Sequence, residues 1–383
     1  MILVFTYFVD LENCVNKATE LIRRGYKKRR IVEVMEDIGC NPLESYEIAN
    51  CRIKIKDKFS KKNLYFDTYG LRYSTPEIIG RYRANRIRGY RIADVSCGVG
   101  MQAIFYSFTN EKILCVDIDA RRIEYARKNA QVYGRNNIQF VVGDSFSEHI
   151  YNMAKEYDII FSDPARKEKE RERRLENLMP SPLKIIEKYG NRDYIFDLPP
   201  QITQDKIPSG WEKEYISLNG KIKRLTAYTG TLYEVDRRAV SLPTGAMLKS
   251  DSQEEFTKKM EFSNYIYIVD ESVYYARLLG ELERKYPSLW YVVTGKRRTL
   301  ATSINLIRSP FLRPFKILFF SDDFNEIIFF LKREGYGKIT LRLNVSPERY
   351  WKIRKKIEEK LNGQKKASLF KIDDNYLVGE DVT

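Results

Sequence analysis

The sequence of 383 residues is short of histidine and cysteine, and both shortages limit the chemistry that it can carry. The single histidine, His149, excludes a histidine-rich metal centre. The five cysteines are Cys14, Cys40, Cys51, Cys97 and Cys115. They form no Cys-x-x-Cys pair, so a zinc knuckle or ribbon is not expected, and we predict no bound metal. An odd, scattered set of cysteines favours a reducing compartment.

Long apolar runs are also missing. Residues 1–14 are mostly apolar, but Asp10 interrupts them and no basic region precedes them, so a signal peptide is not predicted. No stretch of 18 apolar residues follows that would span a membrane. We therefore expect the protein in the cytoplasm.

Positive charge, in contrast, is abundant. Lysine and arginine number 67 against 52 acidic residues, which gives a formal net charge of +15. This excess suits an anionic partner, first of all RNA or DNA. A solvated surface of the hyperthermophile type, rich in lysine and glutamate, is the alternative explanation. Hydrophobic residues make up 43% of the chain, so a packed core is expected, and the length suffices for two or three domains.

The pattern of apolar residues changes twice along the chain. Residues 11–26 and 27–39 have helical spacing, with Asp10 as a possible N-cap of the first helix. From about residue 90, short apolar runs alternate with amphipathic helices, which predicts a parallel, doubly wound α/β sheet. Three further runs, 212–219, 223–230 and 237–245, follow without a full helix between them, which suggests an antiparallel hairpin at one edge.

A polar stretch at residues 249–261 indicates a linker, and strands and helices alternate again after it. The expected organisation is an N-terminal helical region at 1–70, an α/β domain at 71–250 and a second α/β domain at 262–383. No internal repeat is evident.

The segment IADVSCGVGMQAIFY is a strand, a glycine turn and a helix, a pattern that brings backbone amides close to a ligand. Gly98 and Gly100 alone would also fit a dinucleotide fingerprint. Carboxylates follow at the ends of the next three strands. Asp117 is placed to take both hydroxyls of a ribose, Asp144 to accept from an adenine amine, and Asp163 stands before Pro164. Enzymes that use NAD have no requirement for this last pair.

This order of elements resembles class I S-adenosylmethionine-dependent methyltransferases. Residues 93–146 are especially similar to the trimethylguanosine synthase-like branch. The lead-in YSTPEIIGRYRANRI and the segments RRAVSLPTGAML, KRRTLATSINLIRSPFLRPFKIL and KITLRLNVSPERYWKIRKKIEEKLNG resemble a related group of RNA methyltransferases with a THUMP-like C-terminal domain. The resemblance implies a Rossmann-like sheet of seven strands, an N-terminal helical region and a C-terminal α/β THUMP-like domain. It covers roughly residues 70–383.

The resemblance also implies roles for single residues, with S-adenosylmethionine as the cofactor. Asp117 should hold its ribose, Asp144 should accept from its adenine amine, and Asp94 should contact its methionine part. The full set of expected cofactor contacts is Asp94, Cys97, Gly98, Gly100, Asp117, Ile118, Asp144, Ser145 and Asp163.

Asp163, Pro164 and Arg166 are the expected reaction centre, because strand-end carboxylates of a doubly wound sheet face the ligand crevice. The base-amine methyltransferases have Asp/Asn/Ser-Pro-Pro-aromatic here, whereas this chain has Ala165 and Arg166, so the stacking partner is missing from its usual place. Arg166 could bind a phosphate or stack through its guanidinium. The stretch Asp197-Leu198-Pro199-Pro200 on the next strand resembles the motif more closely but lies one strand too far. Pro199 and Pro200 are expected as a second wall of the substrate pocket.

The C-terminal domain is expected to bind RNA, as THUMP-like modules are thought to do, through Arg297, Arg298 and Arg342. The combined hypothesis is an RNA methyltransferase that acts on a base nitrogen of tRNA or rRNA, as a monomer. Two alternatives stay open at this stage. One is an RNA-binding protein with a degenerate methyltransferase core, which the altered Ala165-Arg166 favours. The other is a methyltransferase that acts on protein or on a small molecule, which the positive charge disfavours.

Overall fold

The computed structural model describes residues 10–165, 173–252, 255–343 and 345–383. The chain divides into two compact units. The first consists of Met1–Ser209 with Ala227–Leu232, and the second of Gly210–Thr226 with Tyr233–Thr383. The division into three domains stays a prediction. Arg166 lies outside the described residues, and so does its expected role.

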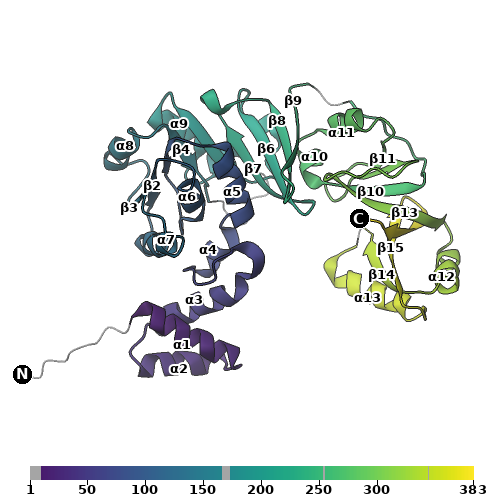
Figure 1. Cartoon of the computed structure of the whole chain (residues 1–383), viewed down its shortest axis with the longest axis horizontal. Coiled ribbons are helices and arrows are strands. Elements are labelled where there is room, and N and C mark those ends of the chain that lie inside the picture. Colours follow the sequence, from purple (N-terminus) through teal and green to yellow (C-terminus); the bar gives the residue numbers. More distant parts are fainter. Residues whose placement is uncertain (1–9, 166–172, 253–254, 344) are drawn as a thin grey trace, which may run out of the picture. The chain divides into compact units, whose positions relative to one another are not determined.

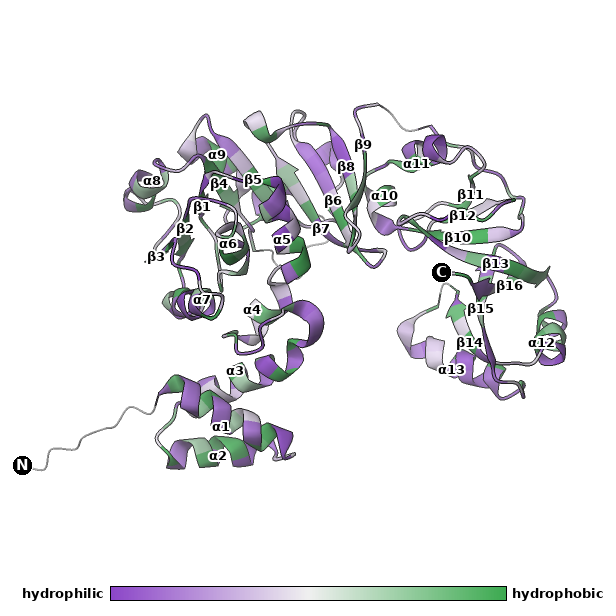
Figure 2. Cartoon of the chain, viewed as in Figure 1, coloured by the Kyte–Doolittle hydropathy of each residue, from purple (hydrophilic) through white to green (hydrophobic). Residues whose placement is uncertain are grey.

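The first unit begins with three helices, α1 (Leu11–Arg23), α2 (Lys28–Asp37) and α3 (Pro42–Lys54). Asp10 caps α1, as expected, by accepting a hydrogen bond from the amide of Asn13 at 3.3 Å. Figure 2 shows apolar and polar residues alternating along α1 and α2, and the apolar faces of these helices belong to one core with α3.

A disulfide joins Cys14 of α1 to Cys40, just after α2. The cysteine pattern had led us to expect a reducing compartment, where such a bond is uncommon. The remaining cysteines are free thiols. The two cysteines of the bond have no motif spacing, so nothing in the sequence marked them as a pair.

Two helices connect this region to the first sheet, α4 (Thr68–Tyr73) and α5 (Glu77–Arg86). The sheet then begins with five strands, β1 (Arg91–Asp94), β2 (Lys112–Asp117), β3 (Ile138–Val142), β4 (Ile159–Ser162) and β5 (Asp193–Leu198). They are parallel and lie in the order β3-β2-β1-β4-β5. The strand order reverses beside β1, so the crevice at the carboxyl ends of β1 and β4 is the place where such sheets bind ligands.

The connecting helices are α6 (Met101–Tyr106), α7 (Ala120–Val132), α8 (Glu148–Ala154) and α9 (Pro182–Tyr189). Figure 1 shows α6 and α7 on one face of strands β1–β4 and α8 and α9 on the other. The core under α6 and α7 is continuous with that of the N-terminal helices. The packing of α5 on α6 is close, since a Cβ at Gly80 would come within 2.1 Å of the Phe105 ring.

The sheet continues through β7 (Lys221–Tyr228), β6 (Glu212–Leu218), β8 (Arg237–Leu242) and β9 (Ala246–Ser250), in this order. The order β3-β2-β1-β4-β5-β7-β6 is the expected seven-stranded sheet, and β8 and β9 extend it to nine strands. β6 and β8 run parallel to each other, and the antiparallel edge hairpin is β8–β9. An antiparallel hairpin thus lies at one edge of the sheet, but the partner of the run 237–245 is β9, which the sequence did not single out, and the runs 212–219 and 237–245 are parallel.

The second unit carries a mixed sheet of seven strands in the order β11-β12-β10-β13-β16-β15-β14. Its strands are β10 (Tyr265–Val269), β11 (Trp290–Val293), β12 (Leu300–Ser303), β13 (Leu312–Ser321), β14 (Tyr336–Arg342), β15 (Lys365–Ile372) and β16 (Asn375–Asp381). Its helices are α10 (Glu271–Tyr275), α11 (Leu279–Lys285), α12 (Phe324–Arg333) and α13 (Pro347–Glu358). Short 3-10 turns occupy Lys56–Lys58, Leu175–Asn177, Gln204–Lys206 and Gly230–Leu232.

Within the described part of the chain, no helix is both long and apolar enough to cross a membrane. The same residues contain no group of three or more histidine, cysteine, aspartate and glutamate side chains that could hold a metal ion.

Candidate functional site

The glycine turn after β1 is shaped by two residues with a left-handed backbone. Gly98 has φ 54° and Gly100 has φ 78°, values that glycine adopts without strain. A Cβ at Gly100 would lie 2.7 Å from the Cβ of Ala126, so α7 packs directly on the turn. A Cβ at Gly98 would meet nothing within 4 Å, so the backbone at Gly98 faces open space. The turn therefore leaves room for a ligand at Gly98 and none at Gly100.

A buried asparagine fixes this turn from behind. The side-chain amide of Asn129 in α7 donates hydrogen bonds to the carbonyl oxygens of Val99 and Tyr65, at 3.1 and 3.0 Å. Its carbonyl oxygen accepts from the amide of Tyr65 at 2.8 Å. Asn129 is fully buried, and these three bonds use all of its donors and one acceptor site. Sequence reasoning missed it, because an asparagine inside an amphipathic helix normally indicates a solvated face.

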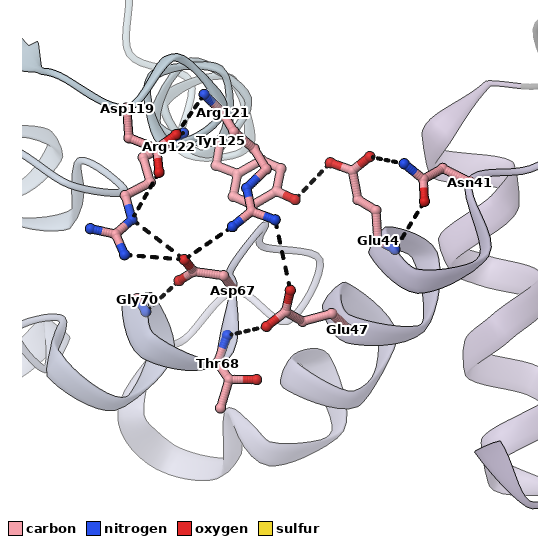
Figure 3. A network of polar contacts seen from close by, with 10 residues as sticks. All are labelled: Asn41, Glu44, Glu47, Asp67, Thr68, Gly70, Asp119, Arg121, Arg122 and Tyr125. Carbon is pink, nitrogen blue, oxygen red and sulfur yellow. Dashed lines mark hydrogen bonds and ion pairs between the residues drawn. The ribbon is translucent and has the colours of Figure 1, made fainter. Parts of the chain in front are cut away.

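An ionic network joins the N-terminal helices to α7, as Figure 3 shows. Asp119 caps α7 by accepting from the amides of Arg121 and Arg122, at 2.9 and 3.2 Å. The guanidinium of Arg122 lies 3.3 Å from the buried carboxylate of Asp67, at the start of α4. Arg121 lies 3.6 Å from Asp67 and 3.9 Å from Glu47 of α3. Because α7 follows directly after β2, this network also positions the end of β2.

Asp117 ends β2 beside the glycine turn. Its carboxylate accepts from the amide of Gly98 at 2.8 Å and from the amide of Asp119 at 3.0 Å. These bonds fix both oxygens in place and leave each one a further lone pair for a hydroxyl. The next side chain, Ile118, is 76% exposed and offers an apolar surface at the same place.

Asp144 follows β3, and its side chain is exposed. One carboxylate oxygen accepts from the amide of Phe146 at 2.9 Å, and no described residue donates to the other. Ser145 is buried, and its carbonyl oxygen accepts from the hydroxyl of Tyr189 at 2.6 Å. The loop after β3 is thus anchored while a carboxylate oxygen stays open to solvent.

Asp94 lies at the end of β1 and is 1% exposed. The amide of Ser96 donates to its carboxylate at 3.2 Å. Burial, together with the nearby charges of Asp163 and Asp117, raises the pKa of Asp94 well above its usual value. The structure therefore brings Asp94, Asp117 and Asp163 together, as the sequence predicted for neighbouring strand ends.

Asp163 follows β4 and is partly exposed. Its amide donates to the hydroxyl of Ser96 at 3.0 Å, and that hydroxyl lies 2.9 Å from the hydroxyl of Ser162. The two serines thereby fix the backbone of Asp163 against the loop after β1. Pro164 is buried.

Met179 lies opposite Ala165 and was missed by sequence reasoning. The two residues exchange both backbone hydrogen bonds, at 2.7 and 2.9 Å, in an isolated antiparallel bridge. Directly opposed residues of a bridge place their side chains on the same side. The side chain of Met179 is 63% exposed, so an accessible thioether stands beside the small side chain of Ala165. No local pattern marks Met179, because the pairing joins positions 14 residues apart across a charged segment.

Cys97, in the glycine turn, is a neutral thiol. Burial and the adjacent Cys115 raise its pKa well above the usual value for cysteine. Its amide donates to the carbonyl oxygen of Val116 at 2.9 Å, which joins the turn to β2. Cys97 therefore contributes position and shape to the turn rather than a thiolate.

Asp197 of β5 is 3% exposed, and its carboxylate makes two hydrogen bonds with the guanidinium of Arg83. Pro199 and Pro200, at the end of the same strand, are buried. Their expected role as a wall of the substrate pocket stays a prediction. The arginines expected to contact RNA belong to the second compact unit, where Arg297 is exposed and Arg298 and Arg342 are partly buried.

Part of the chain matches a family model. Residues 89–170 match the model of the RNA cap guanine-N2 methyltransferase family. This segment runs from just before β1 to beyond β4, and it contains the glycine turn, Asp117 and Asp163.

Curated relatives match over part of the chain. An uncharacterized S-adenosylmethionine-dependent methyltransferase of Mycobacterium tuberculosis is 24% identical over 196 residues, which cover 50% of this chain and 53% of the relative. An uncharacterized RNA methyltransferase of Oceanobacillus iheyensis is 32% identical over 80 residues, 20% of this chain and 17% of that protein. The chain thus spans about half the length, or less, of the curated relatives that it matches.

A solved structure matches almost the whole chain. The crystal structure of a putative methyltransferase from Porphyromonas gingivalis W83 aligns with 97% of this chain and 98% of its own, with a TM-score of 0.74 and 14% identity. The architecture is therefore that of a Rossmann-like α/β methyltransferase. The cofactor named for the M. tuberculosis relative, S-adenosylmethionine, is the one expected from the sequence. The carboxylates and the glycine turn that the fold brings together all lie within the segment that matches the RNA cap guanine-N2 methyltransferase family.

Proposed function

We propose that this protein transfers a methyl group from S-adenosylmethionine to a base nitrogen of RNA, in tRNA or rRNA. The observation that carries the proposal is the convergence of Asp94, Asp117 and Asp163 around an open glycine turn, where a doubly wound sheet binds its ligand. The name of the matching family, which specifies the N2 amine of guanine, supports a nitrogen acceptor. The net charge of +15 supports an RNA substrate.

The residues at the site fit the cofactor. The open face of Gly98 gives its backbone room to approach a ligand, the free lone pairs of Asp117 suit a ribose diol, and the exposed side chain of Ile118 suits the face of an adenine. Asp144 has an open oxygen for the adenine amine. Asp94 lies at the end of β1, just before the turn, and its carboxylate suits the ammonium of the methionine part. When bound, S-adenosylmethionine supplies a methyl group on a positively charged sulfur.

Asp163 is proposed to act on the acceptor nitrogen. The lone pair of a base amine forms the new N–C bond while the electrons of the C–S bond leave with sulfur, so positive charge develops on nitrogen. A carboxylate within hydrogen-bonding distance stabilises that charge and accepts the proton released from nitrogen. The hydroxyl of Ser96, which accepts from the amide of Asp163, keeps this residue in position. Orientation of the base against the methyl donor would supply much of the rate.

Met179 and Ala165 are proposed to contact the face of the base. Related motifs have an aromatic side chain in this region, whereas here a small residue and an exposed thioether stand side by side. A polarizable sulfur packs favourably against an aromatic ring. Ala165 is also the observation that favours the second candidate function, an RNA-binding protein whose methyltransferase core is inactive.

The test is single-turnover transfer of labelled methyl to total tRNA and rRNA from a strain that lacks the protein. Mass spectrometry of the nucleosides identifies the product. Asp163→Ala should lower the rate about 100-fold or more, which corresponds to about 2.7 kcal/mol of barrier, with cofactor affinity almost unchanged. Met179→Ala should weaken RNA affinity with a smaller effect on the rate.

Three outcomes separate the candidates. Methylated RNA base with a defect in the Asp163 variant supports the proposal. RNA binding without any transfer by the unmodified protein identifies the inactive core instead. Normal transfer by Asp163→Ala would show that this aspartate is only a strand end.

A further inference from the structure

Two arginines of the second compact unit lie against one aromatic ring, and a third arginine contacts one of them. Arg298 lies in the loop between β11 and β12, Arg313 is in β13, and Arg342 ends β14. The guanidinium of Arg298 donates a hydrogen bond to the main-chain carbonyl oxygen of Arg342. Arg313 and Arg342 each place the guanidinium carbon 5.6 Å from the centre of the Phe315 ring. Elements that are distant in the sequence thus bring three cations to one place.

The base of this arginine cluster (Arg298, Arg313 and Arg342) is rigid. Phe315 is fully buried and packs edge-on against Phe370 at 5.2 Å. Both rings belong to the apolar core of this sheet. An aromatic ring held in this way fixes the direction of a guanidinium above it, because the cation gains from the face of the ring.

The positive charges are only partly balanced. Arg313 forms an ion pair with Asp381 at 2.5 Å. No ion pair joins Arg298 or Arg342 to a carboxylate within the described ranges, and the Nε of Arg342 is buried without an acceptor there. Three guanidiniums therefore stand against the single carboxylate of Asp381.

The pKa values of both partly buried arginines, Arg298 and Arg342, are lowered. Burial lowers the pKa of Arg298, and the charge of Arg342 lowers it further. Burial and the charge of Arg313 lower the pKa of Arg342, while Asp381 acts in the opposite direction. Cations that are close together and withdrawn from water destabilise one another unless an anion joins them.

We propose that Arg298, Arg313 and Arg342 form a phosphate-binding site, and that its ligand is a phosphodiester of the RNA strand. A phosphate oxygen can accept from the unused donors of two guanidiniums at once, in the forked geometry that arginine offers and lysine does not. The bound phosphate would supply the negative charge that the cluster lacks. The choice of RNA over a free phosphate rests on the proposed function.

The experiment uses the full chain and a fluorescent RNA that the protein binds, with affinity measured by anisotropy at several salt concentrations. Arg298→Gln and Arg342→Gln should each weaken binding about tenfold and lower the slope of log affinity against log salt by about 1. Arg333→Gln is the matched control, because Arg333 is an exposed arginine of the same unit and pairs with Glu334. Binding of S-adenosylmethionine should be the same in all variants.

A second measurement does not depend on the variants. In the unmodified protein, titration with inorganic phosphate should shift the NMR resonance of the Arg342 Nε–H, and phosphate should compete with RNA. Unchanged RNA affinity in both glutamine variants, or no response of Arg342 to phosphate, would overturn the site. Phosphate binding that leaves RNA affinity unchanged would overturn the assignment to RNA.

The failure of this site differs from the failure of the proposed function. If the Arg298 and Arg342 variants bind RNA with unchanged affinity and methylate it normally, the site is refuted and the methyltransferase stands. If the arginine variants lose RNA affinity but no preparation transfers methyl, the site stands and the enzyme does not.

Discussion

Arg83 of α5 and Asp197 of β5 form a bidentate ion pair inside the first compact unit. Their two hydrogen bonds measure 2.7 and 3.1 Å, and the two residues are 114 positions apart in the sequence. The side chains are 0% and 2% exposed. The side-chain oxygen of Gln102, in the helix after the glycine turn, accepts from the same guanidinium at 3.2 Å. The carboxylate that resembled a second reaction centre therefore connects a strand end to two helices.

Removing the charge of one partner of this ion pair should destabilise the fold. Asp197→Asn leaves a buried guanidinium without its counter-charge, so we expect a loss of about 3–5 kcal/mol in the free energy of unfolding. Denaturant unfolding measures it. Asp158→Asn is the control, because Asp158 pairs with Arg91 at the surface and should change stability little. A stable Asp197→Asn variant that has lost its turnover would instead make Asp197 the reacting group.

Asp117 should account for much of the cofactor affinity. Asp117→Ala removes a charged acceptor from the ribose hydroxyls, so S-adenosylmethionine should bind about 1.5–3 kcal/mol more weakly. Asp117→Asn is the matched variant, since its side-chain oxygen can still accept from the Gly98 amide and keep the turn in place. Calorimetry should rank affinity in the order wild type, Asn, Ala. Equal affinity in all three would remove Asp117 from the site.

The raised pKa of Asp94 predicts a pH dependence with a definite sign. The folded protein holds this proton to higher pH than the unfolded chain, in which the usual value is 3.8. Stability in the absence of cofactor should therefore fall as pH rises from about that value through the folded pKa. Asp94→Asn should lack this decline, as thermal unfolding across pH would reveal.

Cofactor binding should show the opposite trend at Asp94. An ammonium beside this carboxylate favours its ionised form, so S-adenosylmethionine should bind more tightly as pH rises through the folded pKa, with release of a proton. Calorimetry in buffers of different ionisation enthalpy detects that release. If the Asp94→Asn variant released the same number of protons on binding S-adenosylmethionine, the proton would come from another group.

Reduction of the Cys14–Cys40 disulfide should loosen the N-terminal helices. The bond closes a loop with a sequence separation of 26 residues. Its removal should cost about 3–4 kcal/mol by the chain-entropy relation. Amide exchange in α1 and α2 should rise on reduction, and a Cys14→Ala/Cys40→Ala variant should match the reduced protein. Mutation of the free thiol Cys51 to alanine controls for the loss of a buried sulfur. Unchanged exchange would mean that helix packing alone holds this region.

The strand ends could be predicted because their signal is local. An apolar run that stops at Asp94, Asp117 or Asp163 identifies both the strand and the carboxylate beyond it, and a parallel sheet brings such ends together. The expectation of a Rossmann-like sheet of seven strands follows from the same alternation and from the family resemblance.

The other features of the site and the sheet could not be predicted, because they depend on contacts between segments that are distant in the sequence. Met179 reaches Ala165 through a bridge, and Asp197 meets Arg83 across much of the first unit. Neither contact is indicated by a periodic pattern of residues or by a motif in the sequence. The position of β8 could not be predicted for a related reason, since strands that follow one another closely are usually neighbours in the sheet. Here β6 lies between β7 and β8.

The buried amide of Asn129 makes the glycine turn and residue 65 parts of one hydrogen-bonded structure. A shortened protein that begins at residue 71 would keep every residue of the S-adenosylmethionine site and still lose two of the three partners of that amide. It would also lose Asp67, which faces the arginines of α7. The segment before residue 70 therefore helps to hold the glycine turn in position. We therefore expect that a fragment with an ordered glycine turn must begin before α4.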